Sequence, residues 1–418
     1  MFRLDKSNLR EYLSDHYPAM DLSRPLVVSK VGEGPVEEDG DGFLNHIFRV
    51  SDGTHKLILK QSFKESLKGG FNDLAADRGR LEFDSLALRR TITPQYVPEP
   101  YFFDAENNIL CVEDVSPLQI MRFQMNKGRI YPGFAEKLGE YLAKTHFYLS
   151  EYYLDLETFR NLSIHFMNHK MRNVFDDLYF ITKTNERQVF GKMVDPLYRR
   201  DIMEYVADPR VISERFKLRE QYVRHGEAFL HGDLHTSNIL LNDKTMQVID
   251  MEYTFAGPVA YDLGYFICNF ISQYICAGFR PFPNEEERRR FKNYCLKETE
   301  RIFETYQRIF LDCWAADAKP MYRDEFEYIK DDFTARLLSD TIGYSANSNM
   351  SRGPEKAETT YPEYAELPSE EARRHAMCLS VFFDFHSLLR RREYKKIGEW
   401  LEELAHIDDI YHKTLSNL

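Results

Sequence analysis

The sequence predicts an α+β fold in two lobes: a small N-terminal lobe with an antiparallel sheet, and a larger, mainly helical C-terminal lobe. Three observations support this prediction. The chain has 418 residues, which is more than one hydrophobic core usually supports. Short runs of β type fill the first third of the sequence, and helical periodicity begins at about Pro132. We expect the lobes to be residues 1–115 and 116–418.

Apolar runs with turn signals between them predict the N-terminal lobe. Residues 43–50 (FLNHIFRV) and 56–61 (KLILKQ) are separated by SDG at 51–53, which is typical of a hairpin. A helical pattern follows at 80–90, and residues 109–115 (ILCVEDV) are the last β-type run. The lobe should therefore contain a sheet and a helix.

A change of period predicts the C-terminal lobe. Apolar and small residues now recur at helical spacing, at Leu138, Tyr141, Leu142, Thr145, Tyr148 and Leu149. Two short apolar runs interrupt the helices at 230–253, and the helical pattern resumes at about Ala260. Residues 353–371 are polar and acidic with three prolines, which predicts a surface loop.

Composition narrows the class of protein. Hydrophobic residues make up 43% of the chain and aromatic residues 14%, so we expect a globular protein. A net charge of -12 argues against binding to nucleic acid or to an anionic membrane. The sequence has no apolar run of signal-peptide or membrane-spanning length, so it predicts a cytoplasmic protein. Its six cysteines lack zinc or disulfide spacing and are expected to be buried free thiols.

The interrupted stretch holds the residues that best indicate chemistry: HGDLHTSN at 231–238, followed by IDME at 249–252. Phosphoryl transfer needs one carboxylate to orient and deprotonate the attacking hydroxyl, and other oxygen ligands for Mg²⁺. We assign Asp233 as the base. We assign the magnesium ligands to Asn238, Asp250 and Glu252, because hard oxygen ligands suit this ion.

Structural explanations compete with this assignment. Taken singly, the HGD sequence is better explained as a turn and Asp250 as the end of a hairpin. The DxxxxN spacing of kinase catalytic loops, combined with the second acidic pair, favours catalysis and the outline of a bilobal kinase. His231 and His235 have the spacing of a metal pair, but we expect them to hydrogen-bond the backbone of the turn.

The N-terminal lobe supplies the predicted nucleotide-binding residues. The glycine-rich segment 40–45 ends at Asn45, and the backbone amides of such a hairpin can approach phosphate oxygens. Lys60 ends the run LILK, where a strand lysine reaches the α- and β-phosphates. Glu82 is expected to pair with Lys60. The structural alternatives are an ordinary turn, a surface lysine and a solvated glutamate.

The end of the last β-type run is the predicted hinge between the lobes. The sequence there is Glu113-Asp114-Val115. We expect backbone groups of Glu113 and Val115 to meet the edge of the adenine ring.

Together these motifs resemble the aminoglycoside phosphotransferase and choline kinase superfamily, and within it the 5-methylthioribose kinase family. The resemblance runs from about Gly40 to Tyr344. Its more specific segments are GDGFLNHIFRV, LILKQS, VEDVSPLQIMR, HGDLHT and IDMEYTFAGPVAYDLGYFICNFI. It implies a protein-kinase-like fold, with ATP as co-substrate and Mg²⁺ as cofactor. The implied reaction is transfer to the 1-hydroxyl of S-methyl-5-thioribose in methionine salvage, by a homodimer.

This chain departs from the family pattern at two places, one in the metal ligands and one at the acceptor site. The family has serine where this chain has Asn238. It also has an adjacent arginine pair at the sugar site, whereas this chain has DTIGYSANSNMSR and then the acidic segment. The resemblance therefore implies Arg352, or the pair Arg373 and Arg374, as substrate-binding residues together with Asp233. A solvated helix face is an equal alternative for these arginines.

Two other functions compete with a methylthioribose kinase. The first is a kinase for another small hydroxyl compound, such as an aminoglycoside, an amino alcohol or another sugar, which the two departures favour. The second is a nucleotide-binding protein without catalysis, but Asp233, Asn238 and Asp250 are all present. In each case the expected partners are ATP or ADP and a small molecule, not nucleic acid or membrane.

Overall fold

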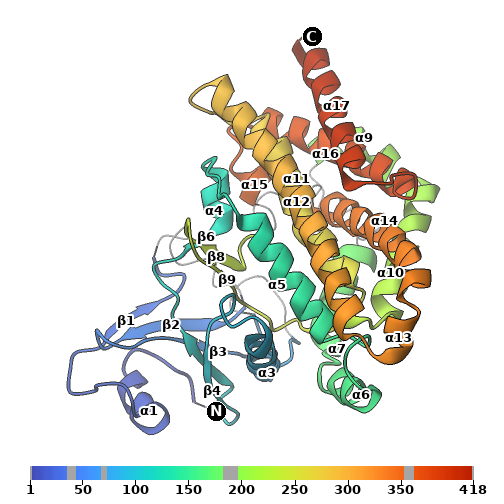
Figure 1. Cartoon of the computed structure of the whole chain (residues 1–418). Coiled ribbons are helices and arrows are strands. Elements are labelled where there is room, and N and C mark those ends of the chain that lie inside the picture. Colours follow the sequence, from blue (N-terminus) through green and yellow to red (C-terminus); the bar gives the residue numbers. More distant parts are fainter. Residues whose placement is uncertain (1, 35–43, 67–72, 182–195, 353–361, 417–418) are drawn as a thin grey trace. The chain divides into compact units, whose positions relative to one another are not determined.

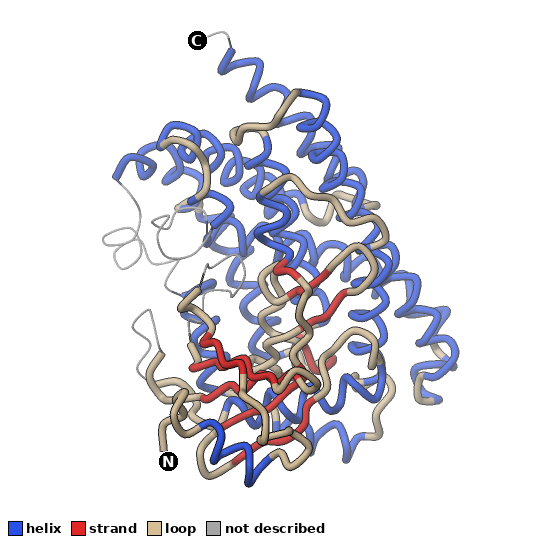
Figure 2. Tube along the Cα trace, turned by 90° about the vertical axis from the view of Figure 1, so that its left-hand side faces the viewer, coloured by secondary structure: helices blue, strands red, loops and turns tan. Residues whose placement is uncertain are grey.

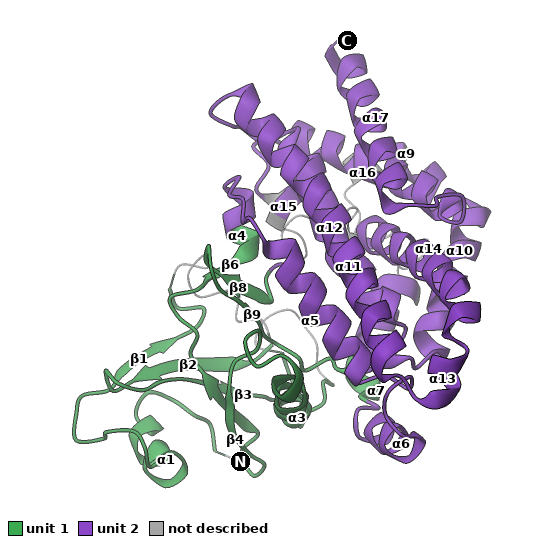
Figure 3. Cartoon of the chain, in the orientation of Figure 1, with its two compact units in different colours: residues 1–123, 168–171, 237–254 green, residues 124–167, 172–236, 255–418 purple. Residues whose placement is uncertain are grey.

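The computed structural model describes residues 2–34, 44–66, 73–181, 196–352 and 362–416. The chain forms two compact units (Figure 3). The first contains Met1–Phe123, Asn168–Met171 and Ser237–Thr254, and the second contains Gln124–Met167, Arg172–Thr236 and Phe255–Leu418. The lobe boundary expected after Val115 stays a prediction.

An antiparallel sheet forms the centre of the first unit (Figure 1). Its strand order is β1-β2-β3-β5-β4, with bounds Val27–Lys30, His46–Ser51, Lys56–Gln61, Ile109–Glu113 and Pro100–Asp104. In β2, His46, Phe48 and Val50 are buried and the residues between them are half-buried, the alternation expected of a strand with one face on a core. The helices α1 (Leu9–His16) and α3 (Arg78–Ile92) complete this part.

A second, three-stranded sheet in the first unit carries the predicted metal ligands. It has the order β6-β8-β9, with bounds Gln119–Ile120, Ile239–Leu241 and Met246–Val248. Ile239 pairs with Val248, and beyond that pair the N–H of Ile249 donates to the carbonyl of Asn238 at 3.0 Å. The short hairpin therefore brings the backbone of Asn238 beside the residue that precedes Asp250.

Figure 2 shows the described helices of the whole chain in blue, and helices make up most of the second unit. They are α5 (Phe134–Tyr148), α6 (Leu156–His165), α9 (Pro196–Val206), α10 (Pro209–Arg224), α11 (Val259–Ala277), α12 (Glu285–Asp317), α13 (Pro320–Asp324), α14 (Phe326–Arg352), α15 (Pro362–Ala365), α16 (Glu370–Arg390) and α17 (Ile397–Ser416), with the π-helical turn η1 (Asp177–Ile181). The helices α4 (Met121–Asn126) and α7 (His169–Asp176) run across the unit boundaries. All of α11 is buried. Beside it, β7 (Ala228–Leu230) pairs with β10 (Phe255–Gly257).

The expected elements are confirmed in type, with shifted ends. The hairpin strands, the helix near 80–90 and the strand near 109–115 are present as β2, β3, α3 and β5. The surface loop expected at 353–371 is wrong for residues 362–365, 370 and 371, which are helical, whereas residues 366–369 form a turn and a bend in which Glu366, Pro368 and Ser369 are exposed. Residues 362–365 form α15, and Glu363 and Tyr364 are buried, because tertiary packing overrides the polar composition. Residues 353–361 and 40–43 lie outside the described residues.

The expected burial of the cysteines is confirmed for four of the six. Cys111, Cys268, Cys276 and Cys295 are buried free thiols, and the other two cysteines are half-buried. Among the described helices, none has an apolar stretch long enough to cross a lipid bilayer.

Candidate active site

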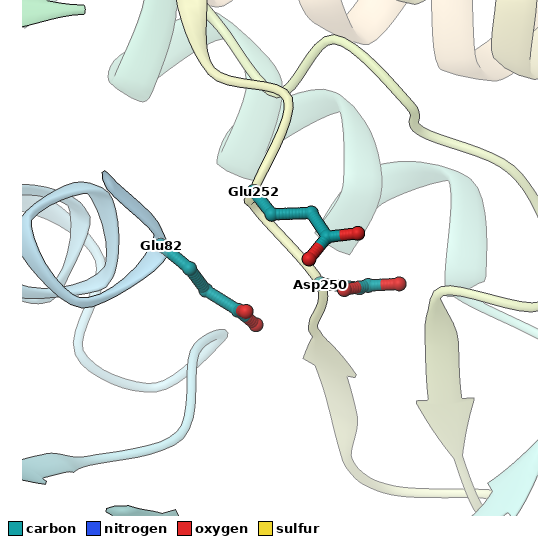
Figure 4. Close-up of side chains that lie close together, drawn as sticks. All are labelled: Glu82, Asp250 and Glu252. Carbon is teal, nitrogen blue, oxygen red and sulfur yellow. The ribbon is translucent and has the colours of Figure 1, made fainter. Parts of the chain in front are cut away.

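Lys60 lies among three carboxylates in the first unit. Its Nζ donates to Oε2 of Glu82 at 2.6 Å and to Oδ1 of Asp250, and lies 3.5 Å from Oε2 of Glu252. Figure 4 shows Glu82 extending from α3 toward the other two carboxylates, which follow β9. The predicted contact between Lys60 and Glu82 is confirmed. Lys60 also contacts Asp250, which comes from a distant part of the sequence.

The carboxylate of Glu252 is fully buried and is held by two polar side chains. Nε of Arg78 lies 3.2 Å from its Oε2, and Nδ2 of Asn45 donates to the same oxygen at 3.0 Å. Arg78 also donates to Oδ1 of Asn45 at 2.6 Å. A buried charge is tolerated when it is paired and hydrogen-bonded in this way. The sequence predicts that Asn45 binds the nucleotide. Among the described residues, its side chain contacts Glu252.

Burial and crowded charge act against each other in this cluster. Burial lowers the pKa of Lys60, but the charges of Asp250, Glu252 and Glu82 outweigh it, so the pKa is raised. Burial raises the pKa of Glu82, the charge of Lys60 opposes this, and the nearby charges of Asp250 and Glu252 raise it further. An additional cation near the carboxylates would relieve their mutual repulsion.

The donor set of the cluster fits a hard divalent cation. Carboxylate oxygens of Glu82, Asp250 and Glu252 all lie within 4.8 Å of one another. Oε1 of Glu252 is buried and has no hydrogen-bond partner among the described residues. Asp250 has a left-handed backbone, with φ of 68°, a conformation that is uncommon outside glycine and often marks functional sites. Two of the predicted magnesium ligands, Asp250 and Glu252, thus lie together.

The predicted catalytic turn lies in the second unit and is anchored by a buried carboxylate. Asp262, on α11, accepts hydrogen bonds from the N–H groups of His231 and Gly232 at 2.7 and 3.0 Å. The ring of His146 lies 3.1 Å from the same carboxylate. Gly232 has φ of 85°, which glycine adopts without steric cost. These contacts fix the backbone of the two residues that directly precede Asp233.

Electrostatics keep Asp262 ionised despite its burial. Burial by itself would raise its pKa. The hydrogen bond and charge of His146, the charge of His231 and the backbone N–H of His231 outweigh this effect, so the pKa of Asp262 is lowered from 3.8.

The side chain of Asp233 lies beside Tyr265 and His235. Tyr265, on α11, donates its hydroxyl hydrogen to Oδ1 at 2.8 Å. Nε2 of His235 lies 3.6 Å from Oδ2. Nδ1 of His231 lies 3.3 Å from the backbone nitrogen of Asp233, as expected for a histidine that supports the turn. The described residues place neither histidine in a cluster of metal ligands.

The predicted hinge groups already take part in local backbone structure. The N–H of Glu113 donates to the carbonyl of Glu99 at 2.8 Å, and the carbonyl of Val115 accepts from Leu118 at 3.2 Å. Their proposed contact with adenine stays a prediction.

The arginines expected at the acceptor have separate surroundings. Arg352 is the last residue of α14, and its side chain lies outside the described part. Arg374 pairs with Asp201 at 2.6 Å and lines a cavity of about 1130 Å³ with residues of α16 and α17. Nε of Arg373 is buried and has no hydrogen-bond partner among the described residues. The role of these arginines stays a prediction.

Three supporting residues were not predicted from the sequence: Arg78, Asp262 and Tyr265. Arg78 stands one turn before Glu82 on α3. Its helical spacing from Glu82, the predicted partner of Lys60, is the signal that could have identified it. Asp262 and Tyr265 stand one turn apart on α11, but no local pattern marks which buried polar residue of an apolar helix faces the turn.

Comparison with known proteins identifies a family model, related sequences and a similar solved structure. Residues 35–302 match the model of the phosphotransferase enzyme family. A methylthioribose kinase from Geobacillus thermodenitrificans is 30% identical over 347 residues, which cover 82% of this chain and 84% of that protein. One from Bacillus velezensis is 27% identical over 371 residues, which cover 88% and 89%. A solved glucosamine kinase, in complex with glucosamine, ADP and inorganic phosphate, has a TM-score of 0.50 and 13% identity, and covers 91% of this chain and 86% of that one.

These matches define the class: the chain belongs to the phosphotransferase enzyme family. It is an ATP-dependent phosphotransferase with a hydroxyl group as acceptor. The predicted α+β, protein-kinase-like fold and the resemblance to methylthioribose kinases are confirmed. The likeness to glucosamine kinase concerns the fold alone.

Proposed function

We propose that this enzyme transfers the γ-phosphoryl group of ATP to the 1-hydroxyl of S-methyl-5-thioribose, a reaction of methionine salvage. The observation that carries the proposal is the similarity to methylthioribose kinases along most of both chains, at 27 to 30% identity. A relationship that covers 82 to 88% of this chain extends over parts of both units. The alternative of another hydroxyl acceptor rests on Asn238 and the altered arginine region.

We assign the following roles to the chain's own residues. Asp233 orients the acceptor hydroxyl and accepts its proton, since a carboxylate beside the attacking oxygen does this in kinases. Lys60, held by Glu82 at 2.6 Å, presents its ammonium group to phosphate oxygens. Backbone groups at Glu113 and Val115 meet the adenine. Arg352, or Arg373 with Arg374, contacts the acceptor.

The residues that would hold magnesium are Asp250, Glu252 and Asn238. Bound there, Mg²⁺ would offset charge on the phosphate oxygens. The buried Oε1 of Glu252, which has no partner among the described residues, and the partly exposed Asp250 are consistent with this role. Arg78 and Asn45 hold the other oxygen of Glu252 and so keep its carboxylate in one orientation.

A panel of acceptors tests the proposal. Purified enzyme with ATP and Mg²⁺ is given methylthioribose, ribose, glucosamine, choline or kanamycin, and ADP release is followed while phosphorus NMR identifies the product. We expect the highest kcat/KM with methylthioribose and a product phosphorylated at the anomeric carbon. A preference for a cationic acceptor would replace the proposed substrate, and ATP binding without transfer would remove the proposed catalysis.

We also propose that the enzyme works as a homodimer in the cytoplasm. The dimer is inferred from the resemblance to methylthioribose kinases. The location is supported by the free cysteines, four of which are buried, since cysteines without disulfides are typical of reducing compartments. Sedimentation of the purified enzyme should give twice the chain mass of 49.5 kDa.

A further inference from the structure

Tyr265 donates a hydrogen bond to the carboxylate that we assign as the base. Its hydroxyl oxygen lies 2.8 Å from Oδ1 of Asp233, and the residue is only 2% exposed. It stands on α11 one turn after Asp262, which holds the backbone N–H groups of His231 and Gly232. The buried helix α11 therefore anchors both the backbone of the catalytic turn and the side chain of Asp233.

Neighbouring aromatic residues fix the ring of Tyr265. Tyr261 stacks on it, with ring centroids 5.6 Å apart and an interplanar angle of 21°. The hydroxyl oxygen of Tyr179, in the π-helical turn η1, lies 3.3 Å from that of Tyr265. Phe175 packs against the ring at a centroid distance of 5.7 Å. A side chain packed in this way has little rotamer freedom, so its hydroxyl stays directed at Asp233.

We infer that Tyr265 is a positioning residue for phosphoryl transfer: it holds Oδ1 of Asp233 so that Oδ2 faces the acceptor hydroxyl. Hydrogen bonds to a carboxylate are short and strongly directional, and proton transfer needs the accepting oxygen within hydrogen-bond reach of the hydroxyl. The inference rests on the proposed role of Asp233 as the base, but not on the identity of the acceptor.

In the reaction, Tyr265 neither gains nor loses a proton. The acceptor oxygen bonds to the γ-phosphorus, the bond from that phosphorus to the bridging oxygen of ADP breaks, and the hydroxyl proton passes to Asp233. Tyr265 keeps the carboxylate in the orientation that receives this proton. Its loss should therefore slow the chemical step and leave nucleotide binding unchanged.

The variant Tyr265→Phe tests the inference, because it removes the hydroxyl and keeps the ring. We would measure kcat and KM with methylthioribose, and in parallel the hydrolysis of ATP with water as acceptor. The expected result is a fall in kcat of about ten-fold or more, with KM for ATP changed by less than about two-fold. In an Asp233→Asn background, the same change should lower the residual rate by less than about two-fold, because no carboxylate remains to be oriented.

A matched control stands on the same helix. Tyr274 is also buried and donates its hydroxyl hydrogen to Oδ2 of Asp408, on α17, at 3.3 Å. Tyr274→Phe removes an equivalent phenol–carboxylate contact, so its melting temperature should fall about as much as that of Tyr265→Phe while its kcat stays at the wild-type value.

Three results would overturn the inference: an unchanged kcat in Tyr265→Phe, an equal loss in both backgrounds, or an equal loss in the control. A wild-type enzyme that hydrolyses ATP but does not phosphorylate methylthioribose contradicts only the proposed acceptor, and the water reaction still decides the role of Tyr265. Absence of both reactions contradicts the proposed function and the inference together.

Discussion

At the scale of single residues, Asp233 and Asp250 have different surroundings that suit different tasks. Asp233 accepts a hydrogen bond from the neutral hydroxyl of Tyr265, and Nε2 of His235 lies 3.6 Å from its other carboxylate oxygen. Asp250 lies against the ammonium group of Lys60 and near Glu82 and Glu252, where several charges meet. The first environment suits a base, and the second suits groups that bind a highly charged ligand.

Substitution of each aspartate should therefore affect a different step. We expect Asp233→Asn to lower kcat about a thousand-fold while Mg²⁺-ATP still binds with nearly wild-type affinity, because the base contacts only the acceptor. Asp250→Ala should weaken Mg²⁺-ATP binding at least about ten-fold as well, because it removes one of the proposed oxygen ligands. Calorimetric titration of Mg²⁺-ATP and single-turnover rates separate the two effects.

The control for this pair is Asp312→Asn, whose side chain is 71% exposed. It should change neither rate nor binding. Equal and modest effects of the Asp233 and Asp250 substitutions on both quantities would show that the two roles are wrongly assigned.

Asp262 should make the stability of the enzyme depend on pH. Its pKa in the folded state is lowered from 3.8, so its ionisation stabilises the fold above that value, and this contribution is lost as pH falls through the folded-state pKa. In Asp262→Asn, an NH₂ group replaces one of the two carboxylate oxygens. This group cannot accept a hydrogen bond, so the N–H of His231 or of Gly232 loses its acceptor. We expect a loss of about 1–3 kcal/mol of unfolding free energy at neutral pH.

Urea unfolding across a pH series measures this dependence. The difference between wild type and Asp262→Asn should shrink as pH falls below about 4, because protonation removes the advantage of the wild-type carboxylate. Asp312→Asn should follow the wild type throughout. A difference that is constant with pH would mean that the charge of Asp262 does not contribute to stability.

At the scale of elements, the close approach of α11 and α14 holds the anchors of the catalytic turn in place. Gly264 lies between Asp262 and Tyr265 on α11. A Cβ at this position would lie 2.5 Å from the carbonyl oxygen of Thr341, 2.7 Å from Cβ of Tyr344 and 2.9 Å from the backbone nitrogen of Ser345. Two of these three atoms belong to the backbone of α14, so neither can move away without shifting that helix.

Gly264→Ala should therefore destabilise the enzyme by about 1–3 kcal/mol, the usual cost of overpacking. Gly398→Ala on α17 is the control, since its Cβ would meet only the flexible end of Glu300, at 2.8 Å. Better helix propensity should make that variant neutral or more stable by up to about 1 kcal/mol. Denaturant unfolding measures both, and equal effects of the two changes would contradict the tight contact between α11 and α14.

The sequence predicted the elements whose signals are local. The turn at 51–53 and the β-type runs around it indicated β2 and β3, and the acidic motifs indicated Asp233 and Asp250. Helical spacing from Glu82 could have indicated Arg78, but not its partner Glu252, which is 174 positions away along the chain and is brought to it only by the folded backbone. For the same reason the burial of Glu363 was missed in a segment that is polar by composition.

At the scale of the whole molecule, the first compact unit is built from separate parts of the chain. Residues 237–254 belong to it together with residues 1–123. The N–H of Val248 donates to the carbonyl of Tyr96 at 2.8 Å, and β8 pairs with β6. The fully buried guanidinium of Arg78 has its carboxylate partner in Glu252. An N-terminal fragment would lose all of these contacts.

We therefore expect a fragment of residues 1–123 not to fold cooperatively. Arg78 would be left without its carboxylate, and burial of an unpaired charge costs about 3–5 kcal/mol, a large fraction of the stability of a small domain. The measurement is thermal unfolding of the fragment, followed by circular dichroism, beside the full chain, which should show a cooperative transition. A sharp transition in the fragment would mean that residues 237–254 are dispensable for this fold. It would also favour the simpler division near Val115, in which the N-terminal lobe folds by itself and then receives the metal ligands from the rest of the chain.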